Sequence, residues 1–392
     1  MTRIFLKPKK DEPLRRFHPW VFSGAILKME GVAADGDTVE VCDSKGEYLA
    51  TGHYQRGGSI SVRVFSFEKT EHGHAFWTMR LSEARAYRSA LGLINNPSTS
   101  CYRLVHAEGD GLPGLIVDVY EKTAVMQCHT IGMHRERMRI AEAIMETGGG
   151  GILAVYDKSR ETLPSDYAAQ VQNGYLFGDS WPQVVAENGH FFYVDWEQGQ
   201  KTGFFLDQRD NRQLLVKYAA GKSVLNAFSY SGGFSVYALV GGARLVHSVD
   251  VSQKAAEWTR NNIEINQFDP DEHETFEMDV LKYLKDCPEY DVMVVDPPAF
   301  AKHFGKRHNA VQGYKRLNAA ALRKLAPGGI LFTFSCSQVV DRQLFYDTIV
   351  AAAIEAGRQV RVMHHLSQPP DHPVSLFHPE GAYLKGLALR VG

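Results

Sequence analysis

Four polar residues in the second half of the sequence are the first candidates for a chemical site. Asp250, Asp279, Asp296 and Cys336 each stand at or just after the end of an apolar run. Because parallel strands place their carboxyl ends at one edge of a sheet, we expect these side chains to line a common crevice. A carboxylate there can accept ribose hydroxyls, and a thiolate can act as a nucleophile.

The turn Ser231–Gly233 is the strongest single motif, because small residues there let a ligand approach the start of a helix. Asp250 ends the next apolar run, about eighteen residues beyond Gly232, where a carboxylate can hold both hydroxyls of a ribose. The alternative is an ordinary strand-to-helix turn with an incidental Asp. A nicotinamide site is disfavoured because the Gly-x-Gly-x-x-Gly pattern is missing. The matching positions of Asp279 and Asp296 favour a cofactor site.

The third and fourth apolar runs add two more carboxylates. Asp279 and Val280 close the third run, where a side chain and an amide can meet an adenine edge, although Asp279 is also a typical N-cap. Asp296 ends the fourth run before Pro297 and Pro298, which stop the strand. The alternative for Asp296 is a plain strand terminator, but ligands bind at this edge in such folds.

Cys336 lies at the end of a later apolar run, between Ser335 and Ser337. An isolated Cys is more often a small buried apolar residue. Its position at the carboxyl end of the run instead favours a reactive thiol facing the same crevice as Asp296.

The elements that must position these residues form a doubly wound α/β sheet. From about residue 223 the apolar runs SVLNAFS, RLVHSVDVS, TFEMDV, YDVMVVDPP and GGILFTFSCS alternate with segments long enough for helices. The first seventy residues instead predict a small β-barrel of short strands. Residues between them alternate strand and helix patterns around a flexible break at Gly148–Gly151, which predicts a small central α/β domain.

Composition limits the class of protein. The chain has 392 residues, 44% hydrophobic and 22% charged, which indicates two or three globular domains. Its five cysteines are odd in number and lack the short spacings of a zinc site or redox pair, so we expect reduced thiols, no metal and a cytoplasmic location. The N-terminal segment lacks the apolar run of a secretory signal, and no stretch is apolar and long enough to span a membrane. The net charge of −2 requires any nucleic-acid footprint to be local.

A basic and aromatic cluster near the N-terminus is a candidate RNA contact. Its members are Lys7, Lys9, Lys10, Arg15, Arg16, Trp20 and Phe22. Cations suit phosphates and aromatic rings suit unstacked bases, although a solvated basic tail beside core aromatics is equally compatible. The loop with His303, Lys306, Arg307 and His308 could contact RNA or be an ordinary surface loop.

Taken together, these motifs resemble the bacterial PUA-containing RNA cytosine-5 methyltransferases that act on 23S ribosomal RNA. The matching stretches are RFHPWVFSGAI, EGDGLPGLIVDVY, KTGFFLDQRDNR, VLNAFSYSGGFSVYAL, VDVSQKAAEWTRNN, VVDPPAFAK, GYKRLNAAAL, LAPGGILFTFSCS and HPEGAYLKGLALRV. They cover nearly the whole chain in the family's order. The resemblance implies a PUA barrel over residues 1–72, a central α/β domain over 73–185 and a Rossmann-like class I methyltransferase domain over 186–392.

The resemblance also implies roles for individual residues. The implied contacts with S-adenosylmethionine are Gln208, Asn226, Phe228, Tyr230, Gly232, Asp250, Ser252, Asp279, Val280, Asp296 and Pro298. Cys336 falls on the nucleophile position, with Asp296 as its catalytic partner, and we expect Arg209 and Trp20 to contact the substrate. The wider group of these enzymes has a second Cys beside the two prolines, where this chain has Ala299. The base for product release is therefore unassigned.

The implied reaction suits the chemistry of cytosine, whose carbon 5 is a poor nucleophile. Addition of a thiolate at carbon 6 would activate carbon 5 for methylation, on a base that is unpaired or flipped out. One alternative is methylation of an exocyclic base amine, and another is a non-catalytic RNA-binding assembly factor. We expect 23S ribosomal RNA as the partner and no membrane association, with a homodimer as the oligomeric state to test.

Overall fold

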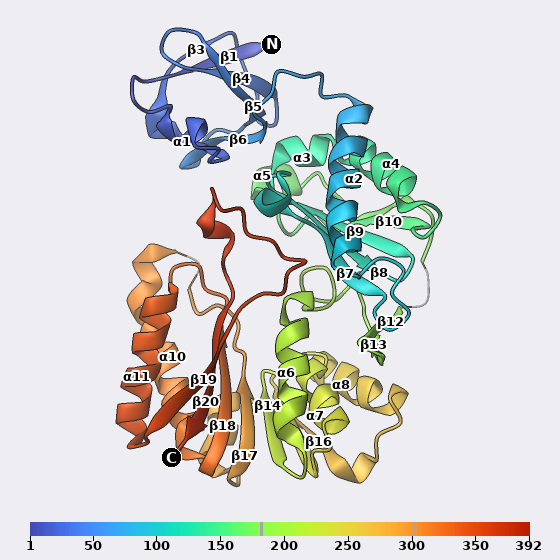
Figure 1. Cartoon of the computed structure of the whole chain (residues 1–392), viewed down its shortest axis with the longest axis vertical. Helices are drawn as coiled ribbons and strands as arrows, with labels where there is room; N and C mark the ends of the chain where they lie inside the picture. The colour runs from blue at the N-terminus through green and yellow to red at the C-terminus, as the bar shows by residue number, and fades with distance from the viewer. Residues whose placement is uncertain (181–182, 302) are drawn as a thin grey trace. The chain divides into compact units, whose positions relative to one another are not determined.

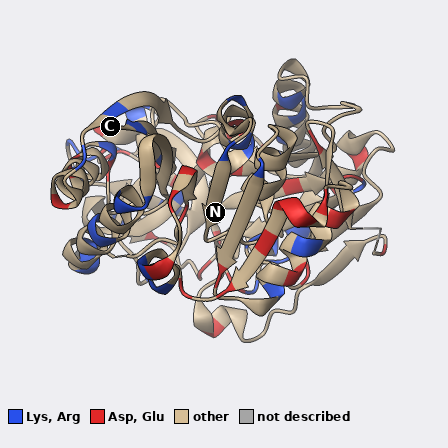
Figure 2. Cartoon of the chain, turned by 90° about the horizontal axis from the view of Figure 1, so that it is seen from below, with Lys and Arg blue, Asp and Glu red and all other residues tan. Residues whose placement is uncertain are grey.

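The computed structural model describes residues 1–180, 183–301 and 303–392. The chain folds into two compact units, which are described separately (Figure 1). The first unit comprises residues 1–188, 194–204 and 370–381, and the second comprises 189–193, 205–369 and 382–392. Among the described residues, no helix combines the length and the apolar character needed to cross a membrane. Figure 2 shows Lys and Arg, in blue, and Asp and Glu, in red, distributed over many helices and strands.

The first unit begins with a six-stranded sheet in the order β2-β6-β5-β4-β1-β3. Its elements are β1 (Thr2–Leu6), α1 (Glu12–Arg15), β2 (Trp20–Phe22), β3 (Ile26–Glu30), β4 (Thr38–Cys42), β5 (Tyr48–Tyr54) and β6 (Ile60–Ser66). A 3₁₀ turn at Ser23–Ala25 separates β2 from β3. Alternate residues such as Ile4, Val39 and Val41 are fully buried and form the core of this sheet.

The rest of the first unit contains a five-stranded sheet in the order β11-β10-β9-β8-β7. Its elements are α2 (His74–Ala90), β7 (Cys101–His106), η2 (Ala107–Asp110), β8 (Leu115–Tyr120), β9 (Thr123–Cys128), α3 (Ile131–Arg135), α4 (Arg137–Gly148), β10 (Ala154–Asp157), α5 (Ser165–Ala168) and β11 (Gly174–Phe177), followed by β12 (Val184–Glu187). Helices α2 and α4 pack together, and Trp77 of α2 is buried in the shared core. The Gly- and Pro-rich stretch DGLPG lies in the connection between the antiparallel strands β7 and β8.

The second unit is built on a seven-stranded sheet in the order β16-β15-β14-β17-β18-β20-β19. Its elements are β13 (His190–Tyr193), η3 (Leu206–Gln208), α6 (Arg209–Ala219), β14 (Ser223–Ala227), α7 (Gly233–Val240), β15 (Leu245–Asp250), α8 (Gln253–Ile265), β16 (His273–Glu277), α9 (Val280–Asp286), β17 (Tyr290–Val295), α10 (Arg307–Arg323), β18 (Leu325–Ser335), α11 (Arg342–Ala356), β19 (Val360–Leu366) and β20 (Lys385–Val391). Strands β14 to β18 pair in parallel as predicted, whereas β20 runs antiparallel to both neighbours.

Helices cover both faces of this sheet. Figure 1 shows α6, α7 and α8 on one side of the strands and α10 and α11 on the other. Every residue of β14 is buried, as expected for a central strand covered on both faces. The chain moves from β14 outward to β16 and then returns to place β17 on the other side of β14. The point between β14 and β17 is therefore a topological switch, where open α/β sheets bind their ligands.

Candidate active site

The four adjacent parallel strands β15, β14, β17 and β18 bring Asp250, Asp296 and Cys336 to one edge of the sheet. Strand β14 pairs with β15 and β17, so that Ala227 lies opposite both Val249 and Val295. Strand β18 lies beside β17 in the same direction. Asp250 is the last residue of β15, Asp296 follows β17, and Cys336 follows β18. The sheet therefore places the predicted residues along the carboxyl ends of its central strands.

The turn between β14 and α7 has an unusual backbone. Phe228, Tyr230 and Gly232 have φ values of 62°, 47° and 75°. Non-glycine residues rarely adopt this left-handed conformation, which clusters at binding sites. A Cβ atom on Gly232 would lie 2.7 Å from Cγ2 of Thr259 in α8, so the turn packs closely against that helix. This close packing explains why a glycine is needed at this position.

Asp250 fixes the same turn through both carboxylate oxygens. Oδ2 accepts a hydrogen bond from the backbone N–H of Tyr230 at 3.0 Å, and Oδ1 accepts one from that of Ser252 at 3.0 Å. Ser252 is the N-cap of α8, where its hydroxyl accepts from the N–H of Ala255. A carboxylate has about four lone-pair sites, so Asp250 retains capacity for ribose hydroxyls.

Two hydroxyl groups in the turn support its assignment to a ligand site. Oγ of Ser229 and Oγ of Ser231 are buried, and neither has a hydrogen-bond partner within the described residues. A buried polar group without a partner is costly unless a ligand or water satisfies it. Together with the open capacity of Asp250, these groups fit a polar nucleoside ligand such as S-adenosylmethionine.

Asn226 is buried and bonded within the fold. Its Nδ2 donates to Oγ of Ser235 at 2.8 Å, and that hydroxyl lies 2.6 Å from Oγ of Ser248. The chain continues to Nε2 of His273 at 2.8 Å. Asn226 is 2% exposed, so its side chain supports the strand beneath the turn from inside. The sequence could not show this, because the partners come from three other elements.

Asp279 and Val280 follow the third strand after a short gap, since β16 ends at Glu277. Oδ1 of Asp279 accepts from the N–H of Lys282 at 2.9 Å, which makes Asp279 the N-cap of α9. The side chain is exposed, whereas Val280 is buried. The N-cap function considered from the sequence is therefore present, and Asp279 also stands at the sheet edge beside Asp250.

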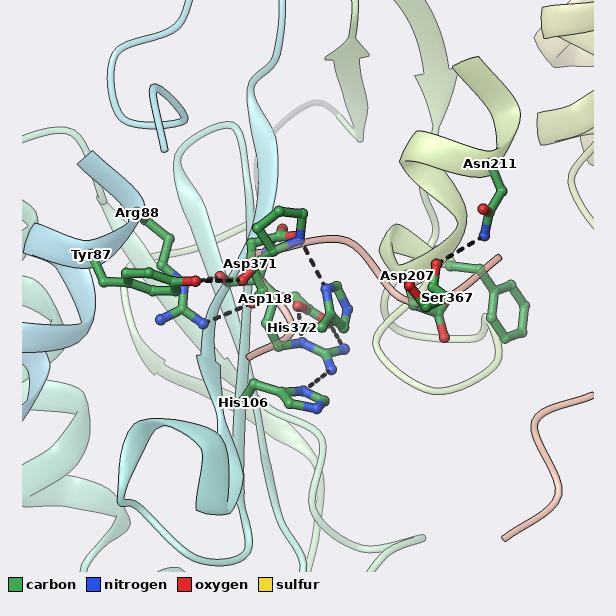
Figure 3. A network of polar contacts seen from close by, with 12 residues as sticks. Tyr87, Arg88, His106, Asp118, Asp207, Asn211, Ser367, Asp371 and His372 are labelled. Carbon is green, nitrogen blue, oxygen red and sulfur yellow. Dashed lines mark hydrogen bonds and ion pairs between the residues drawn. The ribbon is translucent and has the colours of Figure 1, made fainter. Parts of the chain in front are cut away.

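A buried amide holds the carboxylate of Asp296. Nε2 of Gln208 donates to Oδ2 of Asp296 at 2.9 Å, and Oε1 of Gln208 accepts from Nδ2 of Asn211 at 2.6 Å. Nδ2 of Asn211 also donates to the carbonyl of Ser367 (Figure 3). Gln208 is therefore buried and bonded to Asp296. Arg209, the predicted substrate contact, is buried at the start of α6. Pro298, a predicted cofactor contact, is exposed after β17.

The loop after β18 fixes the position of Cys336. Oγ of Ser337 donates to the carbonyl of Ala301 at 2.8 Å, which connects this loop to the one that follows Asp296. Nζ of Lys385 donates to the carbonyls of Ser337 and Val340 at 2.7 and 2.8 Å. Cys336 is half-buried, whereas the other four cysteines are buried.

Two residues that the sequence motifs did not single out lie beside Cys336. Tyr314 of α10 is fully buried, and burial raises the pKa of its hydroxyl, which is also affected by the charges of Cys336 and Asp296. Lys385 opens β20, and its pKa is lowered to about 8, chiefly by burial. Both residues lie in stretches that match the family as a whole. Nothing in their local spacing indicates proximity to a cysteine.

Trp20 and its basic neighbours belong to the first unit. Nε1 of Trp20 donates to Oε1 of Glu108 at 2.8 Å. Lys10, Trp20 and Phe22 line a cavity of about 320 Å³ in the barrel. Arg15 forms ion pairs with Asp11, Asp43 and Glu47, and Arg16 with Glu12. The predicted cluster is therefore partly neutralised, and no ion pair of Lys9 or Lys10 is found within the described residues.

A buried polar network anchors residues 370–381 in the first unit. Arg88 of α2 is fully buried, pairs with Asp110, and donates through Nη2 to the carbonyl of Asp371 at 2.7 Å (Figure 3). The hydroxyl of Tyr87 donates to the carbonyl of Pro370 at 3.1 Å. A segment near the C-terminal end of the chain is thereby part of the first unit, which the sequence-based domain boundaries did not anticipate.

Comparison with known proteins agrees with this geometry. The family model for S-adenosylmethionine-dependent methyltransferases matches residues 149–390, and that for PUA-like domains matches residues 4–67. Ribosomal RNA large subunit methyltransferase I of Aeromonas salmonicida is 40% identical over 394 residues, covering 99% of this chain and 98% of that protein. The chain belongs to the ribosomal RNA large subunit methyltransferase I family. The protein of that name from Klebsiella pneumoniae is 39% identical over 396 residues, with the same coverage.

Solved structures share the fold of this methyltransferase family member. A protein from Streptococcus mutans described as a SAM-dependent methyltransferase superimposes with a TM-score of 0.86, at 23% identity and full coverage of both chains. SMU.776, described as a methyltransferase complexed with SAH, gives a TM-score of 0.87, also at 23% identity and full coverage. By its family matches, the chain is an S-adenosylmethionine-dependent methyltransferase with a PUA-like domain at its N-terminal end, and these structures share its fold.

Proposed function

We propose that this protein forms 5-methylcytosine in the RNA of the large ribosomal subunit, 23S ribosomal RNA, in the cytoplasm. The observation that carries the proposal is the placement of Cys336 beside Asp296 at neighbouring strand ends, with their loops joined through Ser337 and Ala301. The relatives that match over the whole chain are named as methyltransferases of this RNA, which supports the choice of substrate.

Cys336 acts in this proposal as the nucleophile. Its thiolate adds to carbon 6 of the cytosine, and the electrons of the carbon 5–carbon 6 double bond move to carbon 5. S-adenosylmethionine, when bound, supplies the methyl group from its sulfonium. After the proton on carbon 5 leaves to solvent, the electrons of the sulfur–carbon 6 bond return to Cys336. The half-buried position of Cys336 at the sheet edge gives a flipped base access to it.

Asp296 is proposed to stabilise the ring during the addition. A carboxyl group bonded to ring nitrogen 3 stabilises the charge that develops when the thiolate attacks. The hydrogen bond from Gln208 holds Oδ2 of Asp296, so the carboxyl group is oriented before the base arrives. Gln208 stays a proposed cofactor contact and also supports Asp296 through this hydrogen bond.

The cofactor is proposed to bind along the carboxyl ends of β14, β15 and β16. Asp250 accepts the ribose hydroxyls, and Asp279 and Val280 meet the adenine edge. The turn with Phe228, Tyr230 and Gly232 approaches the rest of the ligand. The further proposed contacts are Gln208, Asn226, Ser252, Asp296 and Pro298. Asn226 supports the turn through Ser235.

The first unit is proposed to supply RNA contacts, with Trp20 among them, and Arg209 to contact the substrate from α6. The proposed domain boundaries remain 72/73 and 185/186. The PUA-like match over residues 4–67 supports the first of these. A homodimer stays a prediction, which the sedimentation coefficient of the purified protein would test.

An amine methyltransferase is disfavoured by the position of Phe300. Such enzymes stack an aromatic ring on the target base directly after the two prolines, where this chain has Ala299. The ring of Phe300 lies 4.6 Å from that of Tyr314, centroid to centroid, and packs close to Gly313. Because α10 already occupies one face of the ring, it is poorly placed to stack on a base.

The proposed chemistry predicts a covalent complex with RNA that contains 5-fluorocytosine. With fluorine in place of hydrogen, carbon 5 has no proton to lose after methyl transfer. The sulfur–carbon 6 bond therefore cannot break, and the adduct should survive denaturing electrophoresis. Cys336→Ala should abolish both the adduct and methylation while S-adenosylmethionine still binds. Cys336→Ser should be nearly as inactive, because a hydroxyl is far less ionised than a thiol at neutral pH.

The matched control is Cys287→Ala, which removes a buried thiol from the same unit. This variant should still form the adduct. Methylation by Cys336→Ala at the wild-type rate would contradict the nucleophile assignment and favour amine methylation. RNA binding without any methyl transfer by the wild-type protein would favour an assembly factor.

A further inference from the structure

The side chain of Lys385 is buried beside the loop that carries Cys336. Lys385 is the first residue of β20 and lies opposite Ser335 in the antiparallel pair of β18 and β20. It is 4% exposed. Its ammonium group donates to the carbonyls of Ser337 and Val340, which lie on the C-terminal side of Cys336. The cation is thus held in the turn that contains the thiol.

A lysine ammonium has three N–H donors, and the two loop carbonyls take two of them. Burial lowers the pKa of Lys385 to about 8, and the charge of Cys336 is the largest of the influences that raise it. The electrostatic interaction is mutual, so a cationic Lys385 favours the thiolate form of Cys336.

The other charged and titratable groups near Lys385 do not account for the interaction between Lys385 and Cys336. Arg342 at the start of α11 lowers the pKa of Lys385, and Asp341 raises it less than Cys336 does. Arg342 and His365 line a cavity of about 220 Å³ together with Lys385. The charges of Cys336 and Asp296 both raise the pKa of the Tyr314 hydroxyl, so these groups are also near one another. Of the groups named here, Lys385 is the cation that donates hydrogen bonds to the loop that contains Cys336.

We propose that Lys385 is a positioning residue that holds the Cys336 loop and stabilises the Cys336 thiolate as an ion pair. This inference rests on the proposed role of Cys336 as the nucleophile. When the sulfur–carbon 6 bond forms, the thiolate loses its charge and Lys385 keeps its proton. When that bond breaks, its electron pair returns to sulfur, and the ammonium again faces a thiolate. Lys385 therefore favours both thiolate formation before attack and its departure as the leaving group.

The pH dependence of Cys336 alkylation tests the ion pair without RNA or cofactor. The full-length protein is treated with iodoacetamide from pH 5 to 10, and the Cys336 peptide is quantified by mass spectrometry. The other four cysteines are buried, so Cys336 should react first. In the wild-type protein we expect half-maximal reactivity below the ordinary thiol pKa of about 8.5. In Lys385→Met the midpoint should rise by about one unit, which lowers the rate at pH 7 about tenfold.

Three further variants separate charge from structure. Lys385→Gln keeps a donor for one loop carbonyl but carries no charge, so its alkylation midpoint should rise as in Lys385→Met. It provides the neutral variant if Lys385→Met folds poorly. Lys385→Arg keeps the cation and should restore most of the low midpoint. Lys158→Met is the matched control, because Lys158 is also buried and donates to a backbone carbonyl, but in the first unit. It should leave the Cys336 profile unchanged.

The outcome is decided by the midpoint of alkylation in folded protein. A wild-type midpoint in both neutral variants would overturn the ion pair, as would a Lys385→Arg midpoint equal to theirs. The methylation rate of the neutral variants should fall at pH 7 and recover at higher pH, with the KM for S-adenosylmethionine unchanged. If Cys336→Ala still methylates RNA, the proposed function fails, whereas the alkylation result stands by itself.

Discussion

At the scale of single residues, Asp250 shows how one carboxylate can serve both fold and ligand. Each of its oxygens accepts one backbone hydrogen bond, from Tyr230 and from Ser252. These bonds tie the end of β15 to the turn after β14 and to the start of α8. A ligand that bonds to the same carboxylate therefore meets a group whose orientation is already fixed, which lowers the cost of binding.

Asp250→Ala should weaken S-adenosylmethionine binding measured by titration calorimetry. Loss of charge-assisted hydrogen bonds costs about 1.5–3 kcal/mol, which corresponds to a Kd higher by roughly 10- to 150-fold. Asp250→Asn keeps one acceptor oxygen and should be intermediate. The control is Asp286→Ala, which removes an exposed carboxylate at the end of α9. An unchanged Kd in folded Asp250→Ala would remove this residue from the site.

At the scale of elements, the connection from β14 to α7 explains why the Ser231–Gly233 motif has a glycine at position 232. The turn combines left-handed backbone at Gly232 with close packing on Thr259 of α8. A side chain at this position would suffer from both effects, since left-handed geometry costs L-residues roughly 1–2 kcal/mol and the contact with α8 adds to that. Gly232 is also a proposed contact of the cofactor.

Gly232→Ala should therefore lower both the free energy of unfolding and the affinity for S-adenosylmethionine. Urea unfolding and calorimetry measure the two effects. Gly221→Ala is the matched control, because Gly221 has a φ of 68° but its Cβ would contact nothing within 4 Å. We expect about 1 kcal/mol of destabilisation in the control and about 2–3 kcal/mol at Gly232. Equal losses in the two variants would mean that the packing against Thr259 has no energetic weight.

At the scale of the whole molecule, the division into units differs from the division along the sequence. Residues 194–204 and 370–381 lie within the methyltransferase family match but pack into the first unit. A protein truncated near residue 185 would lose the partners of both segments, including Arg88 for Asp371. RNA binding is therefore better tested by surface substitutions than by truncation.

Lys9→Ala combined with Lys10→Ala should weaken RNA binding and reduce its salt dependence. Each lost phosphate contact lowers the slope of log K against log salt by about 0.7–0.9, so the double variant should lose about 1.5. The control is Lys28→Ala with Lys69→Ala, which removes the same charge from lysines already paired with Glu30 and Glu40. Filter binding over a salt series measures both slopes. Equal slopes for the two double variants would place the RNA elsewhere.

The sequence by itself determined the parallel core of the second unit and which residues stand at its edge. Apolar runs that end in Asp250, Asp296 and Cys336 carry this information locally, because a strand buried on both faces must be apolar and its end must be polar. It also determined the family, through motifs that run along the whole chain. Tyr314 and Lys385 are different, since each meets Cys336 only after distant segments have paired.

Only the tertiary structure decided which of the predicted residues bond to one another. Asn226 and Gln208 fall within the family motifs, yet their amides are committed to Ser235 and Asp296. Side-chain hydrogen bonds of this kind join residues from different elements and leave no periodic trace in the sequence. The same reason explains the placement of residues 370–381, because Arg88 and Asp371 are separated by 283 positions and meet only in the folded chain.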